Sequence, residues 1–225
     1  MTLIGTPLHG KNLFLESMPE MRTTVLEWMD TMTTLGLKIM QGIALSLDLD
    51  ENYFAKLFQP EPTPQFRFFH YPAQDEQRVS ELKTWGVGEH TDFGFLTILK
   101  QDEVGGLEVK VDNKWIPAPP TPGTFVCNMG DMLEKVTGGF YRSNFHRVRC
   151  PNVNRFSYPF FLDPNFDAKV ESIPTAEKLK QEAQADAKWN RFGVINVHDF
   201  KGSYGDFYRA KAAVMLPEMK DELKA

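Results

Sequence analysis

The sequence has little of what marks secreted, membrane or nucleic-acid-binding proteins. Only two of its 225 residues are cysteine, Cys127 and Cys150, so we expect no disulfide framework and a reduced, cytoplasmic compartment. The net charge is -5 and lysine and arginine do not cluster, which argues against nucleic acid as a partner. No apolar run approaches the roughly 18 residues of a membrane-spanning helix. Residues 1–7 lack the basic start and apolar core of a secretory signal, so we expect none.

What the sequence does contain is an ordinary globular composition with a heavy aromatic load. Hydrophobic residues make up 42% and charged residues 24%, as in soluble globular domains. The length suits one domain, residues 1–225, with a substantial core. The 18 phenylalanines are consistent with sheets packed face to face.

The N-terminal part, residues 1–64, is predicted to be helical. Ser17 is the expected N-cap of the first helix, with Pro19 in its first turn and Glu20 closing a capping box. Apolar residues then recur every three or four positions to about residue 48, which is typical of an amphipathic helix lying on the outside of a sheet. Its many methionines could line a binding site, but packing in the core explains them more simply. A short second helix is expected over residues 51–58.

Residues 65–172 are predicted to form a core of short strands. Side chains alternate along residues 65–71, and residues 107–111 and 114–117 form a predicted hairpin. Many short strands separated by turns favour a β-sandwich or jelly roll. Cys127 is expected to be a small buried side chain. Residues 173–225 are predicted to be helical again, with helices over 178–189 and 204–214.

The chemistry is expected near residues 85–99, which read WGVGEHTDFGFLTIL. His90 and Asp92 are two residues apart, so in an extended strand their side chains would point to the same face. His146 follows in a second strand-like segment. Two histidines and one carboxylate on one side of a metal leave its other side open, as in non-haem Fe(II) oxygenases. Alternatively, His90 is a core histidine and Asp92 caps a turn.

A candidate anion-binding pair comes shortly after His146. Arg155 and Ser157 again have the spacing that places two side chains on one face of a strand. A guanidinium group matches a carboxylate with two parallel hydrogen bonds, and a hydroxyl adds a third donor. Taken alone, Arg155 would more simply be a half-buried arginine paired with a surface acid.

In this order, the motifs of the chain resemble those of the Fe(II)/2-oxoglutarate-dependent oxygenases, in their isopenicillin N synthase-like branch. The resemblance is close over about residues 66–217 and loose before them. It is carried by these runs: FHYP at 69–72, GEHTDFG at 88–94, DEVGGL at 102–107, WIP at 115–117, NMGD at 128–131, TGGFYRSNFHRV at 137–148, RFS at 155–157 and FLDP at 161–164.

The resemblance implies an α+β fold with a mainly β core, a double-stranded β-helix (jelly roll) flanked by helices. It implies Fe(II) on His90, Asp92 and His146, and 2-oxoglutarate held by Arg155, Ser157 and Tyr71. With O2, and with ascorbate as an optional reductant, such an enzyme would hydroxylate, desaturate or cyclise a small organic molecule and release succinate and CO2.

Two departures from the family pattern are expected to matter. Family members usually carry a further N-terminal segment before the point where this chain begins, so we expect a short gene model, a fragment or a truncated paralogue. Phe69 stands where the family often has an asparagine that helps to hold the co-substrate. The alternatives are a family oxidase that does not use 2-oxoglutarate, and a non-catalytic jelly-roll binding protein with a structural metal. A structural zinc would usually need four protein ligands, whereas three are evident.

Overall fold

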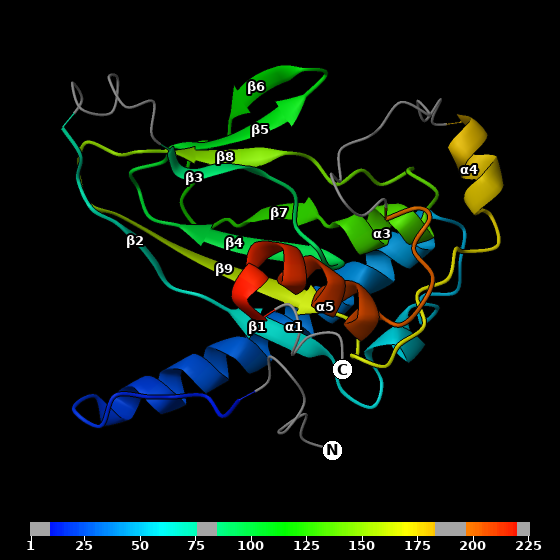
Figure 1. Ribbon diagram of the computed structural model, residues 1–225, viewed down its shortest axis with the longest axis horizontal. Coiled ribbons are helices and arrows are strands. Elements are labelled where there is room, and N and C mark those ends of the chain that lie inside the picture. Colours follow the sequence, from blue (N-terminus) through cyan, green and yellow to red (C-terminus); the bar gives the residue numbers. More distant parts are fainter. Residues whose placement is uncertain (1–9, 76–84, 183–196, 220–225) are drawn as a thin grey trace.

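The computed structural model describes residues 10–75, 85–182 and 197–219, and its core consists of two facing antiparallel sheets (Figure 1). The first sheet has the strand order β1 (Thr63–Phe66), β9 (Arg155–Asp163), β4 (Leu96–Gln101) and β7 (Val126–Met129), and β2 (Phe69–Tyr71) also pairs with β9. The second has the order β3 (Trp85–His90), β8 (His146–Arg149), β5 (Leu107–Val111) and β6 (Lys114–Pro117). This is the predicted double-stranded β-helix.

The first sheet presents alternate residues to its two faces. Ile98 and Leu162 point outward, because both meet the Cβ position of Gly36 on the helix that covers this sheet. Their neighbours along β4 and β9 therefore point inward, toward the second sheet. Consistent with this, Tyr71, which pairs with Arg155 in register, packs against Leu107 and Val148 of the second sheet.

Helix α1 (Pro19–Ser46) covers the outer face of the first sheet with its C-terminal half. Its buried residues are Met32, Gly36, Met40, Ile43 and Ala44. The N-terminal half extends beyond the sheets (Figure 1). The predicted capping box is wrong: Met18 is the N-cap and makes no side-chain bond. Ser17 lies in a turn closed by the Met18 amide on the Leu15 carbonyl, one residue too early to cap the helix.

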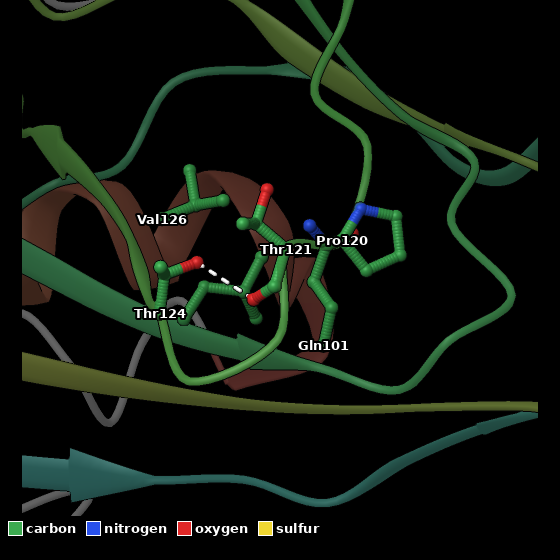
Figure 2. Close-up of a pocket in the computed structure, with 6 residues that line it drawn as sticks. Gln101, Pro120, Thr121, Thr124 and Val126 are labelled. Atoms are coloured by element: carbon green, nitrogen blue, oxygen red, sulfur yellow. Dashed lines mark hydrogen bonds between the residues drawn. The ribbon is translucent and has the colours of Figure 1, made fainter.

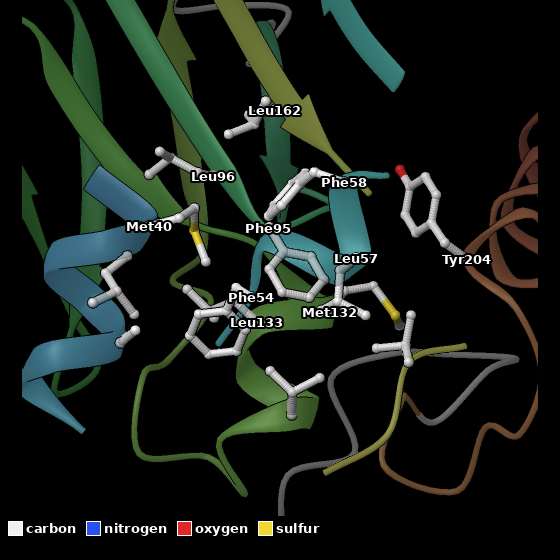
Figure 3. Close-up of a cluster of buried hydrophobic side chains, with 14 of the residues drawn as sticks. Met40, Phe54, Leu57, Phe58, Phe95, Leu96, Met132, Leu133, Leu162 and Tyr204 are labelled. Carbon is white, nitrogen blue, oxygen red and sulfur yellow. The ribbon is translucent and has the colours of Figure 1, made fainter. Parts of the chain in front are cut away.

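The main core lies where α1, the first sheet and two short helices meet. Figure 3 shows Phe54, Phe58 and Phe95 there with side chains of α3 (Asp131–Val136). Phe95 makes edge-on contacts with Phe54 at 6.2 Å and Phe58 at 5.8 Å between ring centroids. The predicted second helix is a 3-10 helix, η1 (Ala55–Phe58). The sequence analysis did not predict α3, because its six residues are too few for a helical period to be recognised.

The C-terminal part packs beside this core. It comprises α4 (Ala176–Glu182), α5 (Tyr204–Met215) and η2 (Pro217–Met219). The predicted helix 178–189 falls partly outside the described residues. A capping box between Ser203 and Asp206 starts α5. The prediction for Cys127 is wrong: it is exposed, because it points outward from the edge strand β7. None of the described helices combines the length and apolar character needed to cross a membrane.

Candidate metal centre and anion-binding site

The structure brings His90, Asp92 and His146 together at one end of the second sheet. His90 ends β3 and pairs in register with His146, which begins β8. One potential ligand atom from each residue lies within 4.8 Å of the others. Asp92 Oδ1 is 3.9 Å from His90 Nε2 and 3.6 Å from His146 Nε2. In the described part of the chain, this is the one such cluster of His, Cys, Asp or Glu.

Asp92 reaches this position from a turn and not, as expected, from the strand. It follows β3, and its carbonyl accepts the Asp131 amide at 2.8 Å. Close approach between chain segments shapes the turn, because a Cβ on Gly130 would lie 2.3 Å from the Gly94 carbonyl oxygen. The small residues of the GEHTDFG and NMGD motifs therefore permit the turn that carries the carboxylate.

Both imidazole rings are oriented by backbone carbonyls. His90 Nδ1 lies 2.9 Å from the Gly88 oxygen, and His146 Nδ1 lies 3.1 Å from the Asn144 oxygen. A carbonyl can only accept, so each Nδ1 carries the hydrogen and each Nε2 keeps its lone pair. The pKa of His90 is lowered, mainly by burial and next by the nearby His146. A lower pKa favours the neutral imidazole, which is the form that binds metals.

The carboxylate of Asp92 is held by its other oxygen. Asp92 Oδ2 accepts hydrogen bonds from Thr97 Oγ1 at 2.5 Å and from Asn128 Nδ2 at 2.7 Å. Oδ1 is thereby left facing the two histidines. Sequence reasoning missed these roles for Thr97 and Asn128, although a threonine inside the apolar run 93–99 was an available signal. The donor set, two imidazole nitrogens and one carboxylate oxygen, fits a divalent transition metal with open positions.

Arg155 lies on the inner face of β9 and is fully buried. Its Nε donates to the Gly105 carbonyl, and its Nη2 donates to Gln101 Oε1 at 3.2 Å. Its Nη1 is buried and has no hydrogen-bond partner among the described residues. Since an unpaired buried cation is costly, this nitrogen suits an anionic ligand.

Tyr71 and Ser157 lie beside Arg155. The guanidinium carbon of Arg155 is 4.7 Å from the centroid of the Tyr71 ring. Ser157 is buried on the same inner face of β9, opposite Gln101 of β4.

A small pocket opens next to Gln101 and is lined by Leu99, Gln101, Pro120, Thr121, Thr124 and Val126 (Figure 2).

A second buried carboxyl group, that of Asp163, packs on the turn that carries Asp92. Asp163 Oδ2 accepts from Tyr204 Oη at 2.6 Å and from Gln65 Nε2 at 3.3 Å. Burial raises the pKa of Asp163 to about 7. A Cβ on Gly94 would lie 1.5 Å from Asp163 Oδ1, so this carboxyl group packs directly on the turn. Asp163 belongs to the FLDP motif, but the motif did not predict this position.

A family model and two curated proteins that resemble this chain all carry the names of oxygenases, oxidases or oxidoreductases. Residues 62–164 match the model of the 2OG-Fe(II) oxygenase superfamily. A Dictyostelium discoideum protein named probable iron/ascorbate oxidoreductase is 41% identical over 99% of this chain and 66% of that protein. A Dictyostelium mucoroides 1-aminocyclopropane-1-carboxylate oxidase is 37% identical over 88% of this chain and 60% of that protein.

A similar structure has also been solved. It is that of a full-length Neurospora crassa protein in complex with alpha-KG, and it has a TM-score of 0.77 and 26% identity, covering 94% of this chain and 63% of that one. Against these three proteins, the chain spans 60% to 66% of their own length.

Proposed function

The chain belongs to the 2OG-Fe(II) oxygenase superfamily, and on that premise we propose that it is part or all of a non-haem Fe(II) and 2-oxoglutarate-dependent dioxygenase. It would hydroxylate, desaturate or cyclise a small organic molecule and release succinate and CO2. Residues 1–64, 65–172 and 173–225 would together form one oxygenase domain.

In this proposal His90, Asp92 and His146 hold Fe(II). The metal, when bound, supplies the oxidation chemistry with O2 and 2-oxoglutarate, and ascorbate could keep it reduced. The chain supplies geometry: the Gly88 and Asn144 carbonyls fix both imidazole tautomers. Three protein ligands would leave further positions on the metal for the co-substrate and O2.

The observation that carries the co-substrate assignment is the buried Nη1 of Arg155, which has no partner among the described residues. A charge held this way needs an anion, and the distal carboxylate of 2-oxoglutarate would provide it. Ser157 and Tyr71 would complete the binding site. Phe69 stands at the position where an asparagine is often found. It lies on β2 opposite Ser157, and Tyr71, two residues later, lies opposite Arg155.

The substrate is proposed only as a small molecule. Relatives carry names as different as homoarginine-6-hydroxylase, gibberellin 20 oxidase and 1-aminocyclopropane-1-carboxylate oxidase. Another structure of the same N. crassa protein contains thymine with alpha-KG. The direct test is succinate formation from 2-oxoglutarate with Fe(II) and ascorbate across a panel of such molecules. Substrate-dependent succinate supports the proposal, and its absence across a broad panel with iron bound counts against it.

A second candidate is an oxidase of the same family that does not use 2-oxoglutarate. The relative named 1-aminocyclopropane-1-carboxylate oxidase favours it. In that case Arg155 would bind the carboxylate of the substrate or ascorbate, and 2-oxoglutarate would neither bind to the metal-loaded protein nor yield succinate.

A structural metal is the remaining alternative, and His90→Ala separates it from catalysis. His90 is the most exposed ligand, with 41% of its side chain accessible, so its loss should leave the fold intact. Loss of turnover with an unchanged thermal unfolding midpoint supports an open catalytic metal. Unfolding of His90→Ala would support a structural one.

We also propose a cytoplasmic location and no nucleic-acid partner. The chain has only two cysteines, too few for a disulfide framework, and its net charge is -5.

A further inference from the structure

We infer that residues 101–106 position Arg155, and that Gln101 is the side chain that keeps its guanidinium group oriented toward the proposed co-substrate. The inference rests on the proposed function and deepens it. It gives a role to the DEVGGL motif and to Gln101, which otherwise have none in the proposed chemistry.

The segment fixes two of the three guanidinium nitrogens. Gly105 turns its carbonyl toward Arg155 Nε, and it does so with φ at 82°, a conformation that favours glycine. Gln101 Oε1 accepts from Nη2 at 3.2 Å. The guanidinium carbon lies over the Tyr71 ring, 4.7 Å from its centroid. The nitrogen left to donate hydrogen bonds to a ligand is mainly Nη1, and the other contacts fix its position.

Gln101 is itself held with its oxygen toward Arg155. Its Nε2 donates to the Ala118 carbonyl at 3.1 Å, so the amide cannot flip without losing both bonds. Gln101 is 7% exposed, which puts these bonds out of reach of bulk water. The buried Gln101 amide therefore positions the Arg155 guanidinium group and makes no contact with bulk water.

Asp102 ties the segment to the strand that carries Arg155. The Asp102 amide donates to the Phe156 carbonyl at 3.2 Å, and the Phe156 amide donates to Asp102 Oδ2. Asp102 Oδ1 accepts the Val104 amide at 3.0 Å, which closes the turn toward Gly105. These bonds join the turn to the start of β9, so the Gly105 carbonyl stays at a fixed distance from Arg155.

The inner face of β4 connects the proposed metal centre with Arg155 and sets the distance between them. Thr97 binds the metal ligand Asp92, Gln101 binds Arg155, and Leu99 lies between them. Four strand residues span about 13 Å between the Cα atoms of Thr97 and Gln101. Both ends reach inward with polar side chains, while the middle is apolar. The polar–apolar–polar order matches the 2-oxo acid group, methylenes and distal carboxylate of a five-carbon dicarboxylate.

The test measures equilibrium binding, not turnover. Calorimetry on the Mn(II)-loaded protein would give dissociation constants for oxaloacetate, 2-oxoglutarate, 2-oxoadipate and pyruvate, which has no distal carboxylate. Wild type should bind 2-oxoglutarate at least about tenfold more tightly than the others, because each of them loses or misplaces the charge-assisted hydrogen bond to Arg155.

Two variants test Gln101, with one control. Gln101→Leu removes the acceptor, and the nearly isosteric Gln101→Glu places a competing carboxylate on Arg155. Both should weaken 2-oxoglutarate binding about tenfold or more and leave pyruvate binding unchanged. Glu103→Gln, exposed in the same turn, should change neither constant.

The outcomes are distinguishable. Unchanged 2-oxoglutarate affinity in folded Gln101→Leu and Gln101→Glu would overturn this inference while leaving the proposed function intact. Equal loss of 2-oxoglutarate and pyruvate binding would also overturn it, because it indicates general damage. A metal-loaded wild type that binds no 2-oxo acid would overturn the proposed function and this inference with it.

Discussion

Thr97 donates a hydrogen bond of 2.5 Å to the carboxylate of Asp92, and both side chains are buried. The bond joins the regular strand β4 to the turn that carries the predicted metal ligand. It occupies Oδ2 and leaves Oδ1 directed at the two histidines. Asp92, the predicted ligand, is thus held in place by a residue outside the predicted ligand set.

Thr97→Val should weaken metal binding about 10- to 100-fold, since the isosteric side chain has no donor for Asp92. Titration with Fe(II) under anaerobic conditions measures the effect. Thr97→Ser keeps the hydroxyl and should stay within a few-fold of wild type. Equal affinities for the valine variant and wild type would show that the contact does not support the site.

Gly94→Ala should destabilise the protein by about 3 kcal/mol or more, because an added Cβ would lie 1.5 Å from Asp163 Oδ1 in a packed region. Denaturant unfolding measures this, and metal affinity should fall with it. Gly88→Ala is the matched control from the same motif: no atom lies within 4 Å of its Cβ position. If Gly94→Ala is as stable as Gly88→Ala, the packing of Asp163 on the turn is wrong.

The metal-free protein should lose stability as pH rises from about 4 to about 7. Burial raises the pKa of Asp163 from 3.8 to about 7, so the folded state binds the proton more tightly than the unfolded state. In this window the unfolded chain has already lost the proton, and the contribution of the protonated group declines with each pH unit. The shift corresponds to about 4 kcal/mol at most.

Asp163→Asn should remove most of this pH dependence, because the amide remains uncharged. Unfolding midpoints between about pH 4 and pH 7 measure it. Asp167→Asn, at an exposed position nearby, should keep the wild-type profile. Parallel profiles for wild type and Asp163→Asn would contradict the assignment.

Strand and turn patterns favoured a β-sandwich or jelly roll, and the resemblance carried by the short motifs added the double-stranded β-helix and the candidate site residues. Their spacing put His90 with Asp92, and Arg155 with Ser157, on shared strand faces, and only the ordered series of motifs linked the two pairs to a metal and an anion. The contacts that hold them are not local. Gln101 lies 54 residues from Arg155, and Asp163 lies 41 residues from Tyr204. No pattern along the chain marks such pairs, because the packing of the sheets brings them together.

Local rules also failed where another interaction took precedence. The pattern Ser17 to Glu20 matches a capping box, but the turn ending at Met18 starts the helix one residue later. Cys127 was expected inside because cysteine is usually buried, but edge-strand geometry turns it outward.

The most direct test of the central claim is the anaerobic titration of 2-oxoglutarate into the Fe(II)-loaded protein, followed by absorption spectroscopy. If His90, Asp92 and His146 hold the metal with open positions and Arg155 anchors the far carboxylate, a metal-to-ligand charge-transfer band should grow and saturate. The band should be lost in His146→Ala and shifted to higher ligand concentration in Arg155→Leu. A protein that binds Fe(II) yet develops no band at saturating 2-oxoglutarate would contradict the account.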